Sequence, residues 1–66
     1  MNITLNGATR EVPTNTTVIE LLQHLGYAGK RVAVERNGDI VPKSQHEKTA
    51  LNDGDQLEIV VAVGGG

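Results

Sequence analysis

Along the first part of the chain, hydrophobic and polar positions alternate with the period of a β-strand. In residues 2–6 the hydrophobic side chains point to one side and the polar ones to the other, which predicts a strand with one face in water. Asn6 and Gly7 favour a tight hairpin turn, because both residues can take a positive φ. Residues 9–13 therefore predict the return strand, with Val12 facing inward.

The pattern then changes to the period of a helix. Thr17 and Glu20 fit a capping box, in which each side chain bonds the free backbone N–H of the other residue. Gly26 suits the left-handed position that follows the end of a helix. These signals predict a helix from about residue 18 to residue 25. Its hydrophobic face consists of Val18, Leu21, Leu22 and Leu25.

Alternation returns after the predicted helix. Residues 31–36 predict a strand whose valines face inward, and Asn37 and Gly38 predict a second tight turn. Residues 39–42 predict a short strand that ends at its proline. The polar residues 43–50 predict an irregular connection with room for a single helical turn.

The last predicted strand, residues 56–63, is the longest and most apolar, and it follows a turn at residues 52–55. We expect this strand at the centre of the sheet, parallel to the first strand. The order of elements predicts an α+β fold: a mixed sheet of four to five strands with one main helix packed on one face. In outline this is the ubiquitin-like β-grasp. The inward residues of the last strand are Leu57, Ile59, Val61 and Val63.

Composition narrows the classes of function. The 66 residues predict a single domain, residues 1–66. The absence of cysteine excludes a disulfide, a thiolate zinc site and a cysteine nucleophile, and it makes the cytoplasm the expected location. With a net charge of −2, scattered basic residues and one aromatic residue, we expect neither nucleic acid nor a membrane as a partner.

Three glycines, Gly64, Gly65 and Gly66, follow the last strand and predict a flexible tail. The only ionic group of this tail is the terminal carboxylate of Gly66. A carboxylate is a poor electrophile, so chemistry at this position requires activation, for example as an acyl-adenylate made with ATP. Three extended residues reach roughly 10 Å, far enough to enter the active site of another protein. The alternative interpretation is an inert terminus or a linker remnant.

The outward side of the last strand predicts a partner-docking surface. Glu58, Val60 and Ala62 alternate away from the helix. Val60 and Ala62, with Ala33 on a neighbouring strand, form a small apolar patch beside the tail. The alternative interpretation is that these are single exposed aliphatic residues, which are common on protein surfaces.

Other polar residues carry weaker signals. His24 and His46 are candidates for acid–base chemistry, but neither has an evident partner in the sequence, and we expect both to be structural or solvated. Asp53 and Asp55 lie near Glu58 and fit turn chemistry better than a metal site, which would need further ligands. No metal site is therefore predicted, and Tyr27 is expected to serve packing.

Two segments, residues 32–44 and 51–66, resemble the ThiS family of thiamine-biosynthesis sulfur carriers. The resemblance implies that an E1-like adenylyltransferase of the ThiF type uses ATP to join the Gly66 carboxylate to AMP. A persulfide sulfur from a cysteine desulfurase then leaves a C-terminal thiocarboxylate, and a thiazole synthase of the ThiG type takes that sulfur. The chain would be a protein substrate, not an enzyme, with no bound cofactor and monomeric when free. The most specific matching residues are Asn37-Gly38, Ile40-Val41-Pro42, Gly54-Asp55 and Ala62 to Gly66.

Three other functions remain as alternatives. The small, sulfur-carrying subunit of molybdopterin synthase shares the fold and a Gly-Gly end. A β-grasp interaction module with an inert tail would show no adenylation. Protein conjugation, as by ubiquitin, would give larger species in which the chain is joined to lysines, and it is the least favoured. Acidic residues such as Asp53, Asp55 and Glu58 could, by analogy, pair with basic residues of the adenylating enzyme.

Overall fold

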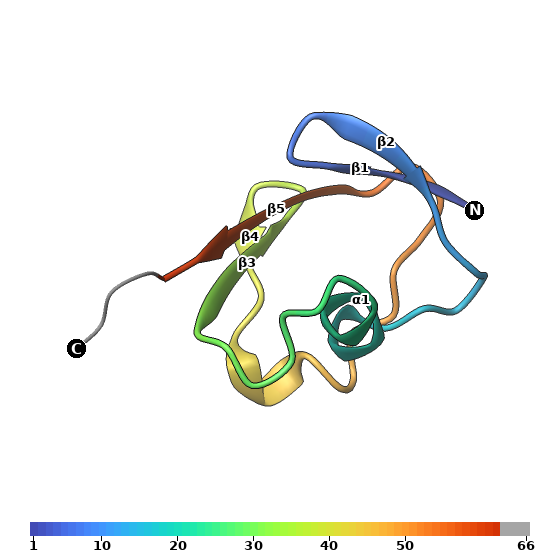
Figure 1. Cartoon of the computed structure of the whole chain (residues 1–66). Helices are drawn as coiled ribbons and strands as arrows, with labels where there is room; N and C mark the ends of the chain where they lie inside the picture. Colours follow the sequence, from blue (N-terminus) through green and yellow to red (C-terminus); the bar gives the residue numbers. More distant parts are fainter. Residues whose placement is uncertain (63–66) are drawn as a thin grey trace.

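Five strands form one mixed sheet in the computed structural model, which describes residues 1–62 (Figure 1). The elements in chain order are β1 (Asn2–Leu5), β2 (Ala8–Glu11), α1 (Val18–His24), β3 (Val32–Arg36), β4 (Asp39–Ile40), the 3₁₀ helix η1 (Lys43–Gln45) and β5 (Gln56–Val61). The strand order across the sheet is β2-β1-β5-β3-β4. The strand β5 is central and parallel to β1, as predicted from the sequence, and it is antiparallel to β3. The predicted α+β architecture is therefore confirmed.

Both predicted hairpin turns are present. Asn6 and Gly7 have φ values of 49° and 85°, and Asn37 and Gly38 have φ values of 52° and 90°. Two consecutive residues with positive φ make the turn type that matches the twist of the flanking strands. Asn-Gly is favoured there because asparagine tolerates this region and glycine has no Cβ to oppose it.

The helix α1 has the boundaries expected from its sequence to within one residue. At its start, Thr17 Oγ1 accepts from the Glu20 N–H at 3.3 Å, and a Glu20 carboxylate oxygen accepts from the Thr17 N–H at 2.9 Å. The Glu20 carboxylate accepts from the Thr17 N–H and also from Thr17 Oγ1 at 3.0 Å, and these two bonds lower the pKa of Glu20. At its end, Gly26 has a φ of 81°, and the Tyr27 N–H donates to the Leu22 carbonyl at 2.8 Å, which completes a Schellman motif.

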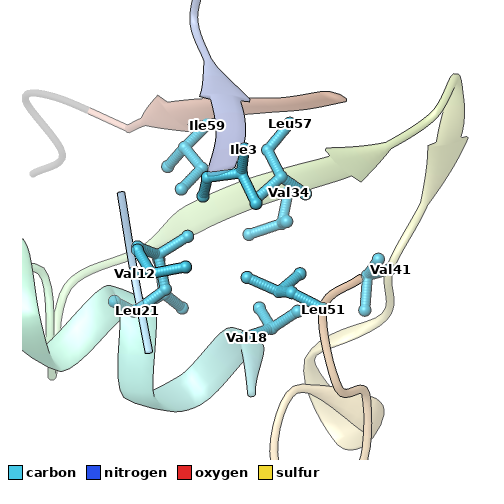
Figure 2. Packing of buried hydrophobic residues seen from close by; sticks show 10 residues of the cluster. Ile3, Val12, Val18, Leu21, Val34, Val41, Leu51, Leu57 and Ile59 are labelled. Carbon is cyan, nitrogen blue, oxygen red and sulfur yellow. The ribbon is translucent and has the colours of Figure 1, made fainter. Parts of the chain in front are cut away.

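The hydrophobic core lies between the sheet and α1, which covers one sheet face (Figure 1). Figure 2 shows side chains from the two layers meeting in this space. The hydrophobic periodicity identified most of this core. It did not identify Val41, within the predicted short strand, or Leu51, just after the predicted irregular connection, and both close the side of the core. Among residues 1–62, the buried hydrophobic residues of the core are Ile3, Val12, Val18, Leu21, Leu22, Val34, Val41, Leu51, Leu57 and Ile59.

The segment around η1 packs against the start of α1. The first N–H groups of a helix have no partner within the helix, and here Val18 donates to Thr49 O at 2.9 Å and Ile19 donates to His46 O at 3.0 Å. His46 is 4% exposed, and its Nε2 lies 3.0 Å from Val41 O. The sequence shows no evident partner for His46, and the fold provides one in the Val41 carbonyl. The expectation of a structural role agrees with its buried position.

Candidate functional site

The site begins at the end of β5, which leads into the glycine tail. Val61 lies opposite Val32 on β3, and the Ala62 N–H donates to the Arg31 carbonyl at 2.9 Å. Pairing with β3 therefore fixes the backbone up to the last described residue. The predicted tail residues, Gly64 to Gly66, and the inward position predicted for Val63 lie outside the described residues.

An asparagine of each hairpin turn forms hydrogen bonds with the backbone of β5. The Asn6 side chain forms two hydrogen bonds with the backbone of Ile59: its Oδ1 accepts from the N–H at 2.9 Å, and its Nδ2 donates to the carbonyl at 3.2 Å. From the other side, Asn37 Oδ1 accepts from the Gln56 N–H at 2.9 Å. The amide side chains thus act as extra strand partners beyond the ends of β1 and β3, and they hold the strand that carries the tail.

Asp55 organises the loop that enters β5. It is 5% exposed, and its carboxylate accepts hydrogen bonds from Arg36 Nε at 2.9 Å, Asn37 Nδ2 at 3.0 Å and the Asn52 N–H at 2.8 Å. Burial by itself raises the pKa of Asp55, but the three hydrogen bonds and the Arg36 charge outweigh it, so the pKa lies below its usual value. The bond from the Asn52 N–H agrees with the expectation that Asp55 stabilises the turn. The ion pair of Asp55 with Arg36 was not predicted from the sequence.

The neighbouring carboxylates have different surroundings. Asp53 is exposed and its Oδ1 accepts from the Asn2 N–H at 2.8 Å, so it fixes the turn to β1. Glu58 is exposed on β5. Among residues 1–62, no group of three or more histidine, aspartate or glutamate side chains is placed to hold a metal ion. The described part of the chain also has no helix of the length and apolarity that crossing a membrane requires.

The sheet surface away from α1 brings together the residues predicted for docking. Val60 lies opposite Ala33, Val60 is 64% exposed, and Ala62 continues on the same side. Ile40 on β4 is also 64% exposed and was not predicted to take part; it lies opposite Glu35 and so shares this side. We call this surface the outer face and define it by Ala33, Glu35, Ile40, Glu58, Val60 and Ala62.

A pair of like charges lies within the outer face. Glu35 and Glu58 are directly opposite each other on β3 and β5. Like charges in this position oppose strand pairing. Neither glutamate forms an ion pair with any of residues 1–62, where the ion pair of Arg36 with Asp55 is the only one. The outer face is therefore apolar and acidic.

Comparison with known protein families and solved structures gives a result that agrees with the fold described above. The ThiS family model matches residues 3–66, which is nearly the whole chain. The chain belongs to the ThiS family. The crystal structure of the ThiS thiamine biosynthesis protein from Geobacter metallireducens superposes with a TM-score of 0.84 at 36% sequence identity, over 100% of both chains. The ubiquitin-like β-grasp fold predicted from the sequence is thereby confirmed.

Curated relatives of two kinds are similar to this ThiS-family chain. The sulfur carrier protein ThiS of Bacillus subtilis (strain 168) is 42% identical over 50 residues, which cover 76% of each chain. A thiazole synthase of Paramagnetospirillum magneticum is 50% identical over 66 residues, and one of Magnetococcus marinus is 41% identical over the same length. The chain spans 20% of the length of each of these two thiazole synthases.

Proposed function

We propose that this protein carries sulfur on Gly66 for the synthesis of the thiazole ring of thiamine. The observation that supports this proposal is that the ThiS family match extends through residue 66 and so includes all three glycines of the tail. Similarity to a sulfur carrier protein from Bacillus subtilis supports the same role.

The chemistry starts at the Gly66 α-carboxylate. A ThiF-type adenylyltransferase transfers AMP from ATP to this carboxylate and releases pyrophosphate. The terminal sulfur of a persulfide, supplied through a cysteine desulfurase, then attacks the acyl carbon and displaces AMP. A thiol cleaves the resulting S–S bond and leaves the thiocarboxylate, whose sulfur a ThiG-type thiazole synthase consumes.

The folded domain acts in this cycle as a protein substrate. Its polar clusters stabilise the fold: His46 is buried against Val41, and Asp55 is occupied by Arg36, Asn37 and Asn52. ATP is bound by the adenylating enzyme, and the carrier itself holds no cofactor. We place the protein in the cytoplasm, as a monomer when free.

The partner at the last step is proposed from the thiazole synthase relatives. In those two proteins, the segment similar to this chain makes up 20% of the length. These proteins are named thiazole synthases and contain a segment similar to this chain. This combination favours thiazole synthesis as the process that consumes the sulfur. The ThiS family match likewise favours this destination over molybdopterin synthesis.

The outer face is the proposed docking surface for the adenylating enzyme. Val60, Ala33 and Ala62 offer apolar contact beside the start of the tail, and Glu58 and Glu35 offer charge. Because these residues belong to the same two strands that fix Ala62, docking here would place the tail at a set distance from the bound enzyme.

Mass spectrometry tests the proposed function directly. The 66-residue chain is incubated with the adenylyltransferase, a persulfide donor and ATP, and the C-terminal peptide is isolated. We expect that peptide to gain the mass difference between sulfur and oxygen. Oxidation of methionine adds nearly the same mass, but the one methionine is Met1, so the two products separate in different peptides. A C-terminal peptide that neither carries AMP nor gains sulfur would favour the inert interaction module.

A further inference from the structure

A basic groove lies on the helix side of β3, opposite the outer face. It has a volume of about 600 Å³ and runs between the connection from α1 to β3 and the segment that contains η1. This volume is in the range of pockets that hold ligands or side chains of partners. Leu22, Tyr27 and Val32 form its apolar, wholly or partly buried floor, and Lys30, Arg31 and Lys43 form its exposed rim.

The rim concentrates positive charge in a protein that is negative overall. The chain has 6 lysine and arginine residues and a net charge of −2, yet three of these basic side chains line this groove. Glu47 is the one acidic residue among the lining residues. None of the three basic side chains forms an ion pair with any of residues 1–62. Within the described part of the chain, their charges are therefore available to a ligand.

The groove is next to Ala62, the last described residue. Arg31 accepts the hydrogen bond from the Ala62 N–H, and Val32 is opposite Val61. Side chains alternate across a strand, so Val32 faces the groove while Ala33 belongs to the outer face. The end of β5 and the start of β3 thus lie between a basic surface and an acidic one that contains Glu35 and Glu58.

We infer that the basic groove binds an acidic segment of a protein partner. A leucine or aromatic side chain of that segment packs on Leu22, Tyr27 and Val32, and its carboxylates pair with the basic rim. The apolar floor favours such a peptide over a small anion, which would leave Tyr27 and Val32 uncovered. This site is separate from the proposed sulfur chemistry and does not depend on it. The groove and the outer face can be occupied at the same time, since they lie on opposite sides of β3.

The test uses a short fluorescein-labelled peptide of alternating glutamate and leucine, with a lysine–leucine peptide as the control probe. Binding is followed by fluorescence anisotropy, and the site is located by amide NMR on the full 66-residue chain. We expect the acidic peptide to shift the amide signals of residues 27–32 and 43–47, and the basic peptide to leave them in place.

Charge reversal on the rim provides the matched comparison. Lys30→Glu combined with Lys43→Glu should weaken binding about tenfold, because two attractions become repulsions. Arg10→Glu combined with Lys48→Glu changes the net charge equally outside the groove and should have much less effect. Urea unfolding verifies that both double variants are folded. Val60→Asp, on the outer face, should bind the peptide normally.

Three results would overturn the inference. One is the absence of binding by the acidic peptide at millimolar concentration. Another is an equal loss of binding in the two double variants, which would indicate net charge alone. The third is a response to inorganic phosphate or AMP as strong as the response to the peptide, which would indicate a small-anion site. None of these results depends on whether Gly66 is converted to a thiocarboxylate, so the two proposals fail independently.

Discussion

Asn6 and Asn37 each stabilise the fold in two ways, and asparagine is a residue type that can do both. Both adopt a positive φ in a turn, and both direct their side-chain amides to the backbone of β5. Glycine would permit the same turn but would lose the side-chain hydrogen bonds, and alanine would lose both. The identity of these residues therefore affects the central strand as well as the turns.

Asn6→Gly and Asn6→Ala separate the two contributions. Asn6→Gly should reduce the free energy of unfolding by about 1–2 kcal/mol, because two hydrogen bonds to Ile59 are lost. Asn6→Ala should cost roughly 1 kcal/mol more, because alanine is strained at the positive φ. Urea unfolding of the three proteins measures both differences. Equal stability of the wild type and Asn6→Gly would show that the side-chain bonds contribute nothing.

Asp55 should make stability depend on pH in the acidic range. Its folded-state pKa is lowered, so the unfolded chain binds the proton more tightly and the stabilisation is present above the unfolded value of about 3.9. This stabilisation is lost as the pH falls through the folded-state pKa. The urea midpoint of the wild type should therefore fall between about pH 5 and pH 2.

Asp55→Asn should flatten that decline. At pH 7 the variant should be less stable by about 2 kcal/mol, since the half-buried Arg36 loses its counter-charge and the buried site loses a charged acceptor. The difference between the two proteins should shrink as the pH falls, because protonated Asp55 also carries no charge. A difference that stays constant from neutral to acidic pH would contradict the assignment of this carboxylate.

At the scale of elements, β5 has two faces with different roles. Leu57 and Ile59 are buried against the core, whereas Glu58 and Val60 point away from it. The inward face stabilises the domain. The outward face contains an exposed valine and a like-charge pair with β3, neither of which stabilises it. Substitutions on the two faces should therefore affect different measurements.

Val60→Asp should weaken docking to the adenylating enzyme by about tenfold or more, because an interface would have to bury an unpaired carboxylate. Unfolding should change little, since the side chain is 64% exposed. Thr9→Asp on β2 is the control at the far edge of the sheet, where Thr9 is exposed. The affinities are compared by calorimetry. Normal binding together with a collapsed melting temperature would disprove a docking role for Val60.

Glu58→Lys should stabilise the fold and impair docking together. It replaces a like-charge pair with an opposite-charge pair across β3 and β5, which is expected to add about 0.5 kcal/mol to the free energy of unfolding. If the acidic outer face contacts basic residues of the enzyme, binding should weaken. Glu11→Lys, an equal charge change at an exposed position of β2 outside both the outer face and the basic groove, is the control. Unchanged affinity in Glu58→Lys would remove Glu58 from the docking surface.

At the scale of the whole molecule, the fold and the proposed chemistry use separate parts of the chain. In the part of the chain that the structure describes, the buried hydrophobic residues lie between Ile3 and Ile59, and the pairing ends at Ala62. The proposed sulfur-carrying residue, Gly66, follows four positions later. The core should therefore tolerate changes at the tail, while the tail depends on the core for its position.

Deletion of Gly66 should abolish adenylation and change the free energy of unfolding by less than about 0.5 kcal/mol. The deletion shifts the carboxylate by about 3.3–3.6 Å of chain, and a misplacement of ~1 Å already costs roughly a hundredfold in rate. Gly66→Ala is the control because it keeps the carboxylate in place and should be impaired less. The measurement is the rate of ATP-dependent adenylation of the wild type, the deletion variant and Gly66→Ala at equal concentration. A normal rate after deletion would show that Gly66 is not the reactive residue.

The sequence by itself determined the local conformations of this protein. Asn-Gly pairs specify turns through φ, Thr17 and Glu20 specify the start of the helix, and the apolar last strand specifies the centre of the sheet. These signals act within a few residues, so the sequence order carries them directly. The glycine tail and the family resemblance were readable for the same reason.

Only the tertiary structure decided which distant residues meet. Asp55 pairs with Arg36, Asn6 bonds Ile59, and His46 is buried under the helix start although its segment reads as a polar loop. Likewise, the basic groove combines α1, the connection that follows it and the segment around η1. Such contacts depend on strand register and on how one layer closes over the other. These arrangements exist only after the sheet and the helix have packed.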